Sequence, residues 1–260
     1  MTGAVNLVSL EGKKGLVVGI ANDKSIAWGC ARLFRQAGAN LAVTYLNAKA
    51  EPHVRPLAES LNSPIILPCD VTHEGEPEAV FASIRARWGR LDFLLHSIAF
   101  APLEDLHGRV TDSTKEGFLK AMDVSCHSFI RMAKLAEPLM KDGGSLLTVS
   151  YYGSEKVVEH YNLMGPVKAA LEASVRYMAV ELGPKNIRVN AISPGPIATR
   201  AASGIAQFDD LLYTAKMKAP LRHLIDLDDV GYMAAFLASD AAKSITGGVH
   251  YIDCGYEVVD

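Results

Sequence analysis

The chain has 260 residues, of which 49% are hydrophobic and 21% are charged. A chain of this length can bury one large core, and its apolar content excludes a disordered or low-complexity protein. Its 26 basic and 29 acidic side chains leave a formal net charge of −3, which offers no general attraction to nucleic acid or to an anionic membrane. We therefore expect neither as a partner.

The cysteines and the first residues place further limits on the protein class. No CxxC pair or Cys/His cluster at metal spacing occurs, so we predict reduced thiols and no bound metal. Cys69 and Cys254 fall in predicted strands, where we expect them to be packing residues. Glu11, Lys13 and Lys14 interrupt the start before the apolar region of a secretory signal forms. No apolar run approaches the ~18 residues of a membrane span, so we predict a cytoplasmic protein.

Strand-like and helix-like segments alternate along the chain. Short runs rich in β-branched residues or leucine predict buried parallel strands at 15–20, 40–46, 64–71, 91–99, 145–150, 187–195 and 248–255. Helices are predicted between them at 25–37, 50–61, 74–88, 114–140, 161–182, 207–217 and 228–239. This alternation predicts an α/β fold, a Rossmann-type doubly wound sheet of seven parallel strands with helices on both faces, in a single domain over 1–260.

The loop after the first strand is suited to a dinucleotide. Gly19 lets the chain turn sharply, and Ser25 and Ile26 then open a helix whose free N–H groups could face a pyrophosphate. Gly29, one turn into that helix, would allow close packing on the sheet. Ser25 equally suits a simple N-cap.

The ends of the next strands predict the rest of a dinucleotide site. The second strand ends at Leu46, with neither a carboxylate for an adenosine ribose nor an arginine, although Lys49 is close. Asp70, followed by Val71, could accept from an adenine amino group or cap the entry to a helix. The fourth strand closes with residues expected beside the ribose and the nicotinamide, namely Ser97, Ile98 and Ala99.

A tyrosine and a lysine near the start of one predicted helix are candidates for catalysis. Tyr161 and Lys168 are seven residues apart, which is two helical turns, so both would lie on one helix face. Pro166 would disturb that helix little if it lies near the first turn. Taken singly, the tyrosine suits a core position and the lysine a solvated surface. The literal Tyr-x3-Lys pair, Tyr152 and Lys156, is rejected because Gly153 makes this segment a loop.

These motifs together resemble those of a known family. The loop Gly19 to Gly29, the runs HSIAF and SYYG, and the stretches 161–184 and 187–205 are similar to the bacterial enoyl-acyl-carrier-protein reductases of the divergent short-chain dehydrogenase branch. The resemblance runs essentially from end to end. Tyr-x6-Lys, with Tyr151 ten residues before Tyr161, is the specific feature that separates this branch from ketoreductases.

The resemblance implies a reaction and roles for residues. Hydride from NADH would reach the β-carbon of a trans-2-enoyl thioester, in type II fatty-acid synthesis, with the Tyr161 hydroxyl stabilising the enolate before protonation at the α-carbon. Lys168 would hold the nicotinamide ribose, and its charge would favour an ionised or strongly donating tyrosine. Tyr151 would border the acyl pocket. The resemblance also implies an enoyl-acyl carrier protein as substrate and a homotetramer.

The same resemblance implies a loop and a lid after the sixth strand. A lid is expected over about 196–220, and Phe208 equally suits ordinary packing. The loop residues expected at the cofactor are Gly195, Pro196, Ile197 and Thr199. The residues expected at the acyl chain are Phe100, Ala101, Tyr151, Tyr161, Met164, Ala201, Ile205 and Phe208.

Several positions depart from the family pattern. Ala99 replaces a common glycine and would narrow the space beside the nicotinamide, and Leu46 replaces a glutamine frequent in NADH-dependent members, which leaves NADPH as an alternative cofactor. Acidic or neutral side chains, Gln207, Asp209 and Asp210, stand where many members have basic ones. A basic rim for an acidic carrier protein could come from Lys216, Lys218 and Arg222, which equally suit a solvated surface. The alternatives in function are a carbonyl (ketoacyl) reductase of the same fold and a catalytically silent cofactor-sensing protein.

Overall fold

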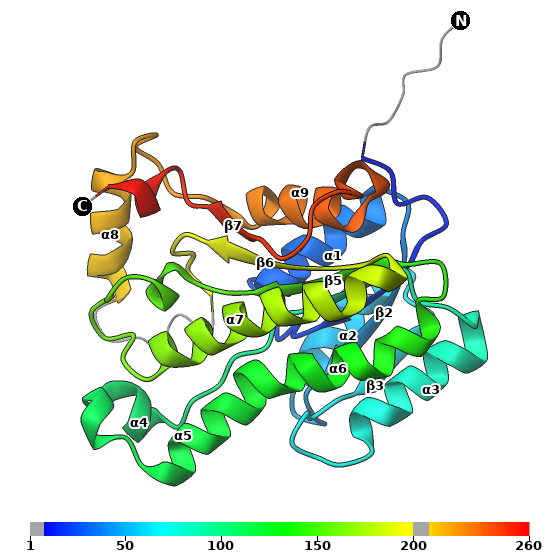
Figure 1. Ribbon diagram of the computed structural model, residues 1–260, viewed down its shortest axis with the longest axis horizontal. Helices are drawn as coiled ribbons and strands as arrows, with labels where there is room; N and C mark the ends of the chain where they lie inside the picture. The colour runs from blue at the N-terminus through cyan, green and yellow to red at the C-terminus, as the bar shows by residue number, and fades with distance from the viewer. Residues whose placement is uncertain (1–7, 200–207, 260) are drawn as a thin grey trace, which may run out of the picture.

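Seven parallel strands form one sheet in the computed structural model, which describes residues 8–199 and 208–259 (Figure 1). Their order is β3-β2-β1-β4-β5-β6-β7, so the predicted fold class is confirmed. The strands are β1 (Lys14–Val18), β2 (Asn40–Tyr45), β3 (Ile65–Pro68), β4 (Phe93–His96), β5 (Gly144–Val149), β6 (Ile187–Pro194) and β7 (Val249–Ile252).

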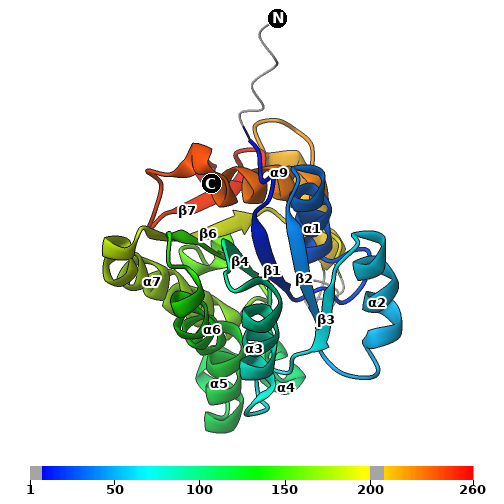
Figure 2. The ribbon, with the colours of Figure 1, turned by 90° about the vertical axis from the view of Figure 1, so that its right-hand side faces the viewer.

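Helices cover both faces of the sheet (Figure 2). One face carries α1, α2 and α9, and the other carries α3, α5, α6 and α7. Their bounds, with those of α4 and α8, are α1 (Ile26–Gln36), α2 (Glu51–Ser60), α3 (Glu76–Trp88), α4 (Leu103–His107), α5 (Lys115–Met122), α6 (Ser128–Ala136), α7 (Met164–Leu182), α8 (Phe208–Lys218) and α9 (Leu227–Ala238). The described helices include none long and apolar enough to cross a membrane.

Alternation along the strands builds two separate cores. In β4, Leu94 packs toward α6 and α7, whereas Phe93 and Leu95 pack toward α1 and α9. Successive side chains of a strand point to opposite faces, so an apolar run in each central strand fills both cores at once. The sheet is thereby buried on both sides, and only its ends remain accessible to a ligand.

The topology places that accessible end beside β1. The neighbours of β1 are β2 and β4, so the chain crosses to one side of β1 first and to the other side later. In open parallel sheets such a reversal leaves a crevice at the carboxyl ends of the strands. The predicted site residues after β1, β4, β5 and β6 therefore meet at one edge.

One predicted helix and two predicted strands were too long. The expected helix 114–140 is divided into α5 and α6 by a π-helical segment, Asp123–His127. The predicted strands 64–71 and 248–255 end earlier, so Cys69 and Cys254 lie just beyond β3 and β7. Cys254 has a left-handed backbone, with φ of 60°, which no regular strand allows. All of the cysteines are free thiols.

A buried histidine joins the central strands to α6. His96 is fully buried at the end of β4, with Nδ1 3.1 Å from Thr148 Oγ1 and Nε2 2.7 Å from Ser128 Oγ. The Ser128 hydroxyl donates to the Val124 carbonyl, so it accepts from Nε2–H and leaves Nδ1 to accept from Thr148. Burial, with the nearby charge of Lys168, lowers the pKa of His96 to about 3. The ring is therefore neutral and fully bonded.

This neutral histidine should make stability depend on pH. Its ordinary pKa of 6.5 returns on unfolding, so the unfolded chain binds a proton that the folded chain refuses as the pH falls below 6.5. Between pH 7 and pH 5 this linkage should cost about 2 kcal/mol of the free energy of unfolding. Urea denaturation of wild type and His96→Asn at both pH values measures it. An equal loss in the two proteins would contradict the assignment.

Candidate active site

The turn after β1 requires a glycine. Gly19 has φ of +113°, and a Cβ there would lie 2.0 Å from the carbonyl oxygen of Ser97, at the end of β4. Ser97 N in turn donates to Val18 O at 2.9 Å, which holds the two strand ends together. This close approach holds the turn against the end of β4, and the positive φ agrees with the sharp turn predicted at Gly19.

Ser25 holds together the loop between β1 and α1, and its side chain does not cap α1. Its Oγ accepts from Ala21 N at 2.9 Å and from Asn22 N at 3.0 Å. The loop is thus folded back before Ile26 opens the helix, and α1 has no side-chain cap bond. Free N–H groups at a helix start are suited to an anion.

Gly29 has a different role from the one expected. A Cβ at Gly29 would lie 2.7 Å from Leu227 Cβ, so the glycine permits close packing of α1 on α9 and not on the sheet. A Cβ at Gly231 of α9 would in turn lie 3.1 Å from the Gly29 carbonyl oxygen. Two glycines on facing helices therefore set the position of α1.

The adenosine end is formed by the tips of β2 and β3. Leu46 is exposed there, and Asp70 accepts from Thr72 N at 2.9 Å and from Thr72 Oγ1 at 2.7 Å. Burial acts to raise the pKa of Asp70, but the bonds from Thr72 outweigh it and the pKa lies below its ordinary value. Asp70 is therefore a charged acceptor at a turn, and not the cap of α3, whose N-cap is Gly75. The neighbouring Val71 is buried and its carbonyl accepts from Arg131.

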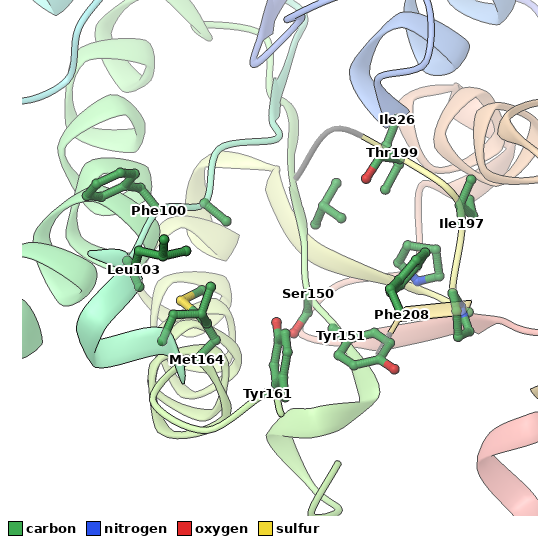
Figure 3. A pocket seen from close by; sticks show the side chains of 17 residues that line it. Ile26, Phe100, Leu103, Ser150, Tyr151, Tyr161, Met164, Ile197, Thr199 and Phe208 are labelled. Carbon is green, nitrogen blue, oxygen red and sulfur yellow. The ribbon is translucent and has the colours of Figure 1, made fainter. Parts of the chain in front are cut away.

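A cavity of about 330 Å³ opens at the carboxyl edge of the sheet (Figure 3). Phe100, Leu103 and Met164 gather on one side of it, whereas Ile197 and Phe208 lie on the other. The walls are mainly apolar. The remaining lining residues are Ile26, Ala99, Ala101, Leu106, Val149, Ser150, Tyr151, Tyr161, Pro194, Gly195, Pro196 and Thr199.

Two tyrosines meet between the two sides of the cavity. The rings of Tyr151 and Tyr161 are 4.8 Å apart between centroids and inclined at 65°. Such an edge-to-face contact fixes both rings. The hydroxyl oxygen of Tyr151 is buried and has no hydrogen-bond partner in the described part of the chain. A buried hydroxyl of this kind is suited to donate to a ligand in the cavity.

Tyr161 does not lie on the helix that carries Lys168, so that part of the prediction was wrong. The helix α7 begins three residues later, at Met164, because His160 and Asn162 have positive φ of 63° and 41°. Asn162 is held there by a 2.8 Å bond from Nδ2 to the Leu106 carbonyl of α4. Pro166 falls in the first turn of α7, where its missing N–H costs no bond, as predicted.

Lys168 is buried beneath the sheet edge, with 4% of its surface exposed. Its Nζ donates to the carbonyl of Val149, the last residue of β5, at 2.6 Å. Burial lowers the pKa of Lys168 to about 8, and the negative charge of Glu172 acts against that shift. The ammonium is therefore charged at neutral pH and close to its titration.

Tyr161, in the turn before α7, remains protonated. Burial, with the nearby Tyr151 and Glu172, raises the pKa of Tyr161 above its ordinary value. Of the two forms expected for Tyr161, ionised or strongly donating, the raised pKa favours the second, with the proton on the hydroxyl. The rejected pair, Tyr152 and Lys156, is not carried on a helix, as predicted. Tyr152 lies in a 3₁₀ turn, and its ring centroid is 5.7 Å from that of Tyr256.

Most of the predicted substrate and nicotinamide residues come together at the cavity, but two cannot be placed. Ala201 and Ile205 lie outside the described residues, and the lid over 196–220 stays a prediction. Sequence reasoning missed Leu103 and Leu106, which line the cavity from α4. Pro102 before the short run LEDLH was the signal available, since proline favours a helix start.

The crevice, the glycine turn beside it, the tyrosine pair and the buried lysine bonded to the end of β5 define a class of protein, the short-chain dehydrogenases and reductases. Comparison with known families narrows this class. A family model described as Enoyl-(Acyl carrier protein) reductase matches residues 19–257. The chain belongs to that family.

Individual relatives agree along the whole length. A curated enoyl-[acyl-carrier-protein] reductase [NADH] of Nostoc is 48% identical over 256 residues, covering 97% of this chain and 99% of the relative. One from Rhizobium meliloti is 46% identical, covering 96% of this chain and 92% of the relative. The solved Anaplasma phagocytophilum enzyme in complex with NAD is 50% identical, with a TM-score of 0.93 and coverage of 97% and 96%. The Bacillus cereus enzyme, solved with NADP+ and an indole naphthyridinone, is 44% identical, with a TM-score of 0.94 and coverage of 96% and 98%.

A glycine beside the tyrosine pair offers a test of this packing. A Cβ at Gly153 would lie 2.5 Å from Tyr161 Cδ1 and 3.3 Å from Tyr151 Cδ1, so Gly153→Ala should lower the free energy of unfolding by about 1–3 kcal/mol. Gly183→Ala is the matched control, since nothing lies within 4 Å of its Cβ position. Urea denaturation measures both variants. A Gly153→Ala protein as stable as Gly183→Ala would show that the ring pair is not fixed.

Proposed function

We propose that this chain reduces the trans-2 double bond of enoyl thioesters carried on acyl carrier protein, with NADH as the electron donor, in type II fatty-acid synthesis. The observation that carries the proposal is the Tyr151–Tyr161 pair in a mainly apolar cavity, with a buried Lys168 bonded to the Val149 carbonyl two residues before Tyr151. The relatives named enoyl-[acyl-carrier-protein] reductase [NADH] support the choice of substrate and cofactor.

The residues at the crevice fit a nicotinamide dinucleotide. The turn at Gly19 is held against Ser97 at the crevice, and the uncapped start of α1 follows after the short loop 20–25. Leu46, Asp70 and Val71 would flank the adenosine, and Lys168 would hold the nicotinamide ribose. Ile98 and Ala99 after β4, and Gly195 to Thr199 after β6, would border the nicotinamide. Bound NADH would supply the hydride.

Tyr161 would act as the donor to the substrate. As the double bond accepts hydride at the β-carbon, negative charge develops on the thioester oxygen, and a protonated hydroxyl beside that oxygen stabilises it. The raised pKa of Tyr161 keeps this proton on the hydroxyl at neutral pH. Lys168 would strengthen the donor through its positive charge. The apolar walls exclude water, which makes each of these interactions stronger.

Tyr151 would limit the reaction to enoyl substrates. Its buried hydroxyl has no partner among the described residues, so it too is available to the thioester oxygen. Burial raises the pKa of Tyr151, with smaller contributions from Tyr256 and Tyr152, so this hydroxyl also stays protonated. Phe100, Met164 and Phe208 would enclose the acyl chain.

The exposed end of α8 would face the carrier protein. Lys216 and Lys218 lie in its last turn and are exposed, and Arg222 follows with its side chain donating to the Met217 carbonyl. A basic rim of this kind favours encounter with an acidic carrier protein. The chain would carry out this reaction in the cytoplasm.

We also propose a homotetramer. Tyr177 and Val180 project from α7 with 81% and 80% of their surface exposed, and Phe118 and Leu119 are exposed on α5. Large apolar side chains left exposed on helices favour association.

The first test follows oxidation of NADH and of NADPH with crotonyl and longer enoyl thioesters, and with a β-ketoacyl thioester. Wild type should consume the enoyl substrates, and Tyr161→Phe should lose about 10²–10³-fold in kcat because the donor is absent. Lys168→Ala should weaken NADH binding in a titration. Turnover of the keto substrate alone would favour a carbonyl reductase, and cofactor binding without turnover would favour a sensor.

The second test measures oligomeric state by light scattering. Replacing both Tyr177 and Val180 with glutamate should convert the tetramer to smaller species, since like charges would be brought into the interface. Tyr213→Glu on α8 is the control, because this tyrosine is also exposed but lies on another element. A wild-type monomer, or a tetramer that survives the double substitution, would contradict the proposed interface.

A further inference from the structure

Glu172 is a buried carboxylate whose partners come from the active-site loop. It lies on α7 with 3% of its surface exposed. The hydroxyls of Ser150 and Ser154 both donate to its Oε1, Ser154 at 2.7 Å. A buried charge without partners would be costly, so these bonds account for its presence inside the protein.

The two serines bracket the segment that carries Tyr151, one member of the tyrosine pair. Ser150 directly precedes Tyr151, and Ser154 closes the 3₁₀ turn Tyr152–Ser154. One carboxylate oxygen therefore holds both ends of a five-residue loop. The Tyr151 hydroxyl has no bond of its own in the described part of the chain, so this anchor and the contact with Tyr161 set the position of its ring.

Glu172 also lies one helical turn after Lys168, on the same face of α7. Both side chains are buried, so their attraction is little screened by water. The other titratable groups that influence Lys168 are the Cys126 thiol, whose own pKa burial raises, and neutral His96 on β4. Tyr161 is protonated. Among these groups, Glu172 is the carboxylate, and it acts to raise the pKa of Lys168 against the effect of burial.

We propose that Glu172 is a positioning residue of the reductase, which anchors the Tyr151 loop through Oε1 and keeps Lys168 charged through its carboxylate. The inference rests on the proposed function, because it assumes that Tyr151 and Lys168 serve the reaction. Two separable properties of one side chain are involved: an acceptor oxygen and a negative charge.

Substitutions can separate these two properties. Glu172→Gln keeps an acceptor oxygen for both serines and removes the charge, whereas the double variant Ser150→Ala/Ser154→Ala keeps the charge and removes the bonds. Glu172→Ala removes both. Glu181→Gln is the matched control, since Glu181 is an exposed carboxylate on the same helix.

Two readouts are measured for each variant: the Kd for NADH across about pH 6 to 10, and kcat and KM with crotonyl thioester. In wild type, NADH binding should weaken as the pH rises through about 8, where free Lys168 loses its proton. In Glu172→Gln, NADH binding should weaken at a pH about one unit lower than in wild type, because the negative charge that favours protonated Lys168 is gone. The serine double variant should leave that pH as in wild type and lose about tenfold or more in kcat through misplacement of Tyr151.

Each outcome bears on one part of the proposal. If NADH binding weakens at the same pH in Glu172→Gln as in Glu181→Gln, the proposed role of the charge is overturned. A serine double variant with wild-type kcat overturns the anchor. Should Glu172→Ala fail to fold, the other variants still decide both points. If Lys168→Ala leaves NADH binding and its pH dependence unchanged, the proposed function fails in its use of Lys168, and that result is distinct from failure of the Glu172 roles.

Discussion

The burial of Lys168 is the constraint on which the rest of the site depends. A charged ammonium on a residue that is 4% exposed is tolerated only where polar groups face it, and here the Val149 carbonyl accepts a hydrogen bond from it. That bond ties α7 to the end of β5, at the point where the loop of Tyr151 begins. The cavity, the tyrosine pair and the buried Glu172 all follow from this one junction between a helix and a strand end. The same low-polarity surroundings bring the lysine near its titration at neutral pH.

The sequence predicted the sheet well because its strands are buried on both faces. Runs such as LVV in β1 and FLL in β4 are apolar at every position, so they could be recognised without knowledge of their neighbours. Predicted ends were less accurate. Cys69 and Cys254 look like strand residues by composition, but where a ladder stops depends on the partner strand, which a single segment does not encode.

The sequence identified several residues of the site but not how they are placed on the helices and loops. Tyr161 and Lys168 were identified by spacing, yet Tyr161 lies in a turn because Asn162 is bonded to the Leu106 carbonyl, a contact across 56 residues of sequence. Glu172 carried no signal of its own, because a glutamate within a helix usually faces water. Its importance appears only when Ser150 and Ser154 are brought against it.

The π-helical segment between α5 and α6 connects the length of a helix to the shape of the cavity. Ser125, inside that segment, accepts from the Phe100 amide at 2.9 Å and donates to the Phe100 carbonyl at 3.0 Å. Three residues later, Ser128 accepts from His96. A π-turn is equivalent to one inserted residue, and removing it would rotate one helix against the other by about 100°. Ser125 and Ser128 could then no longer bond both Phe100 and His96, so this one extra residue fixes how the helix meets the end of β4 and the cavity wall beyond it.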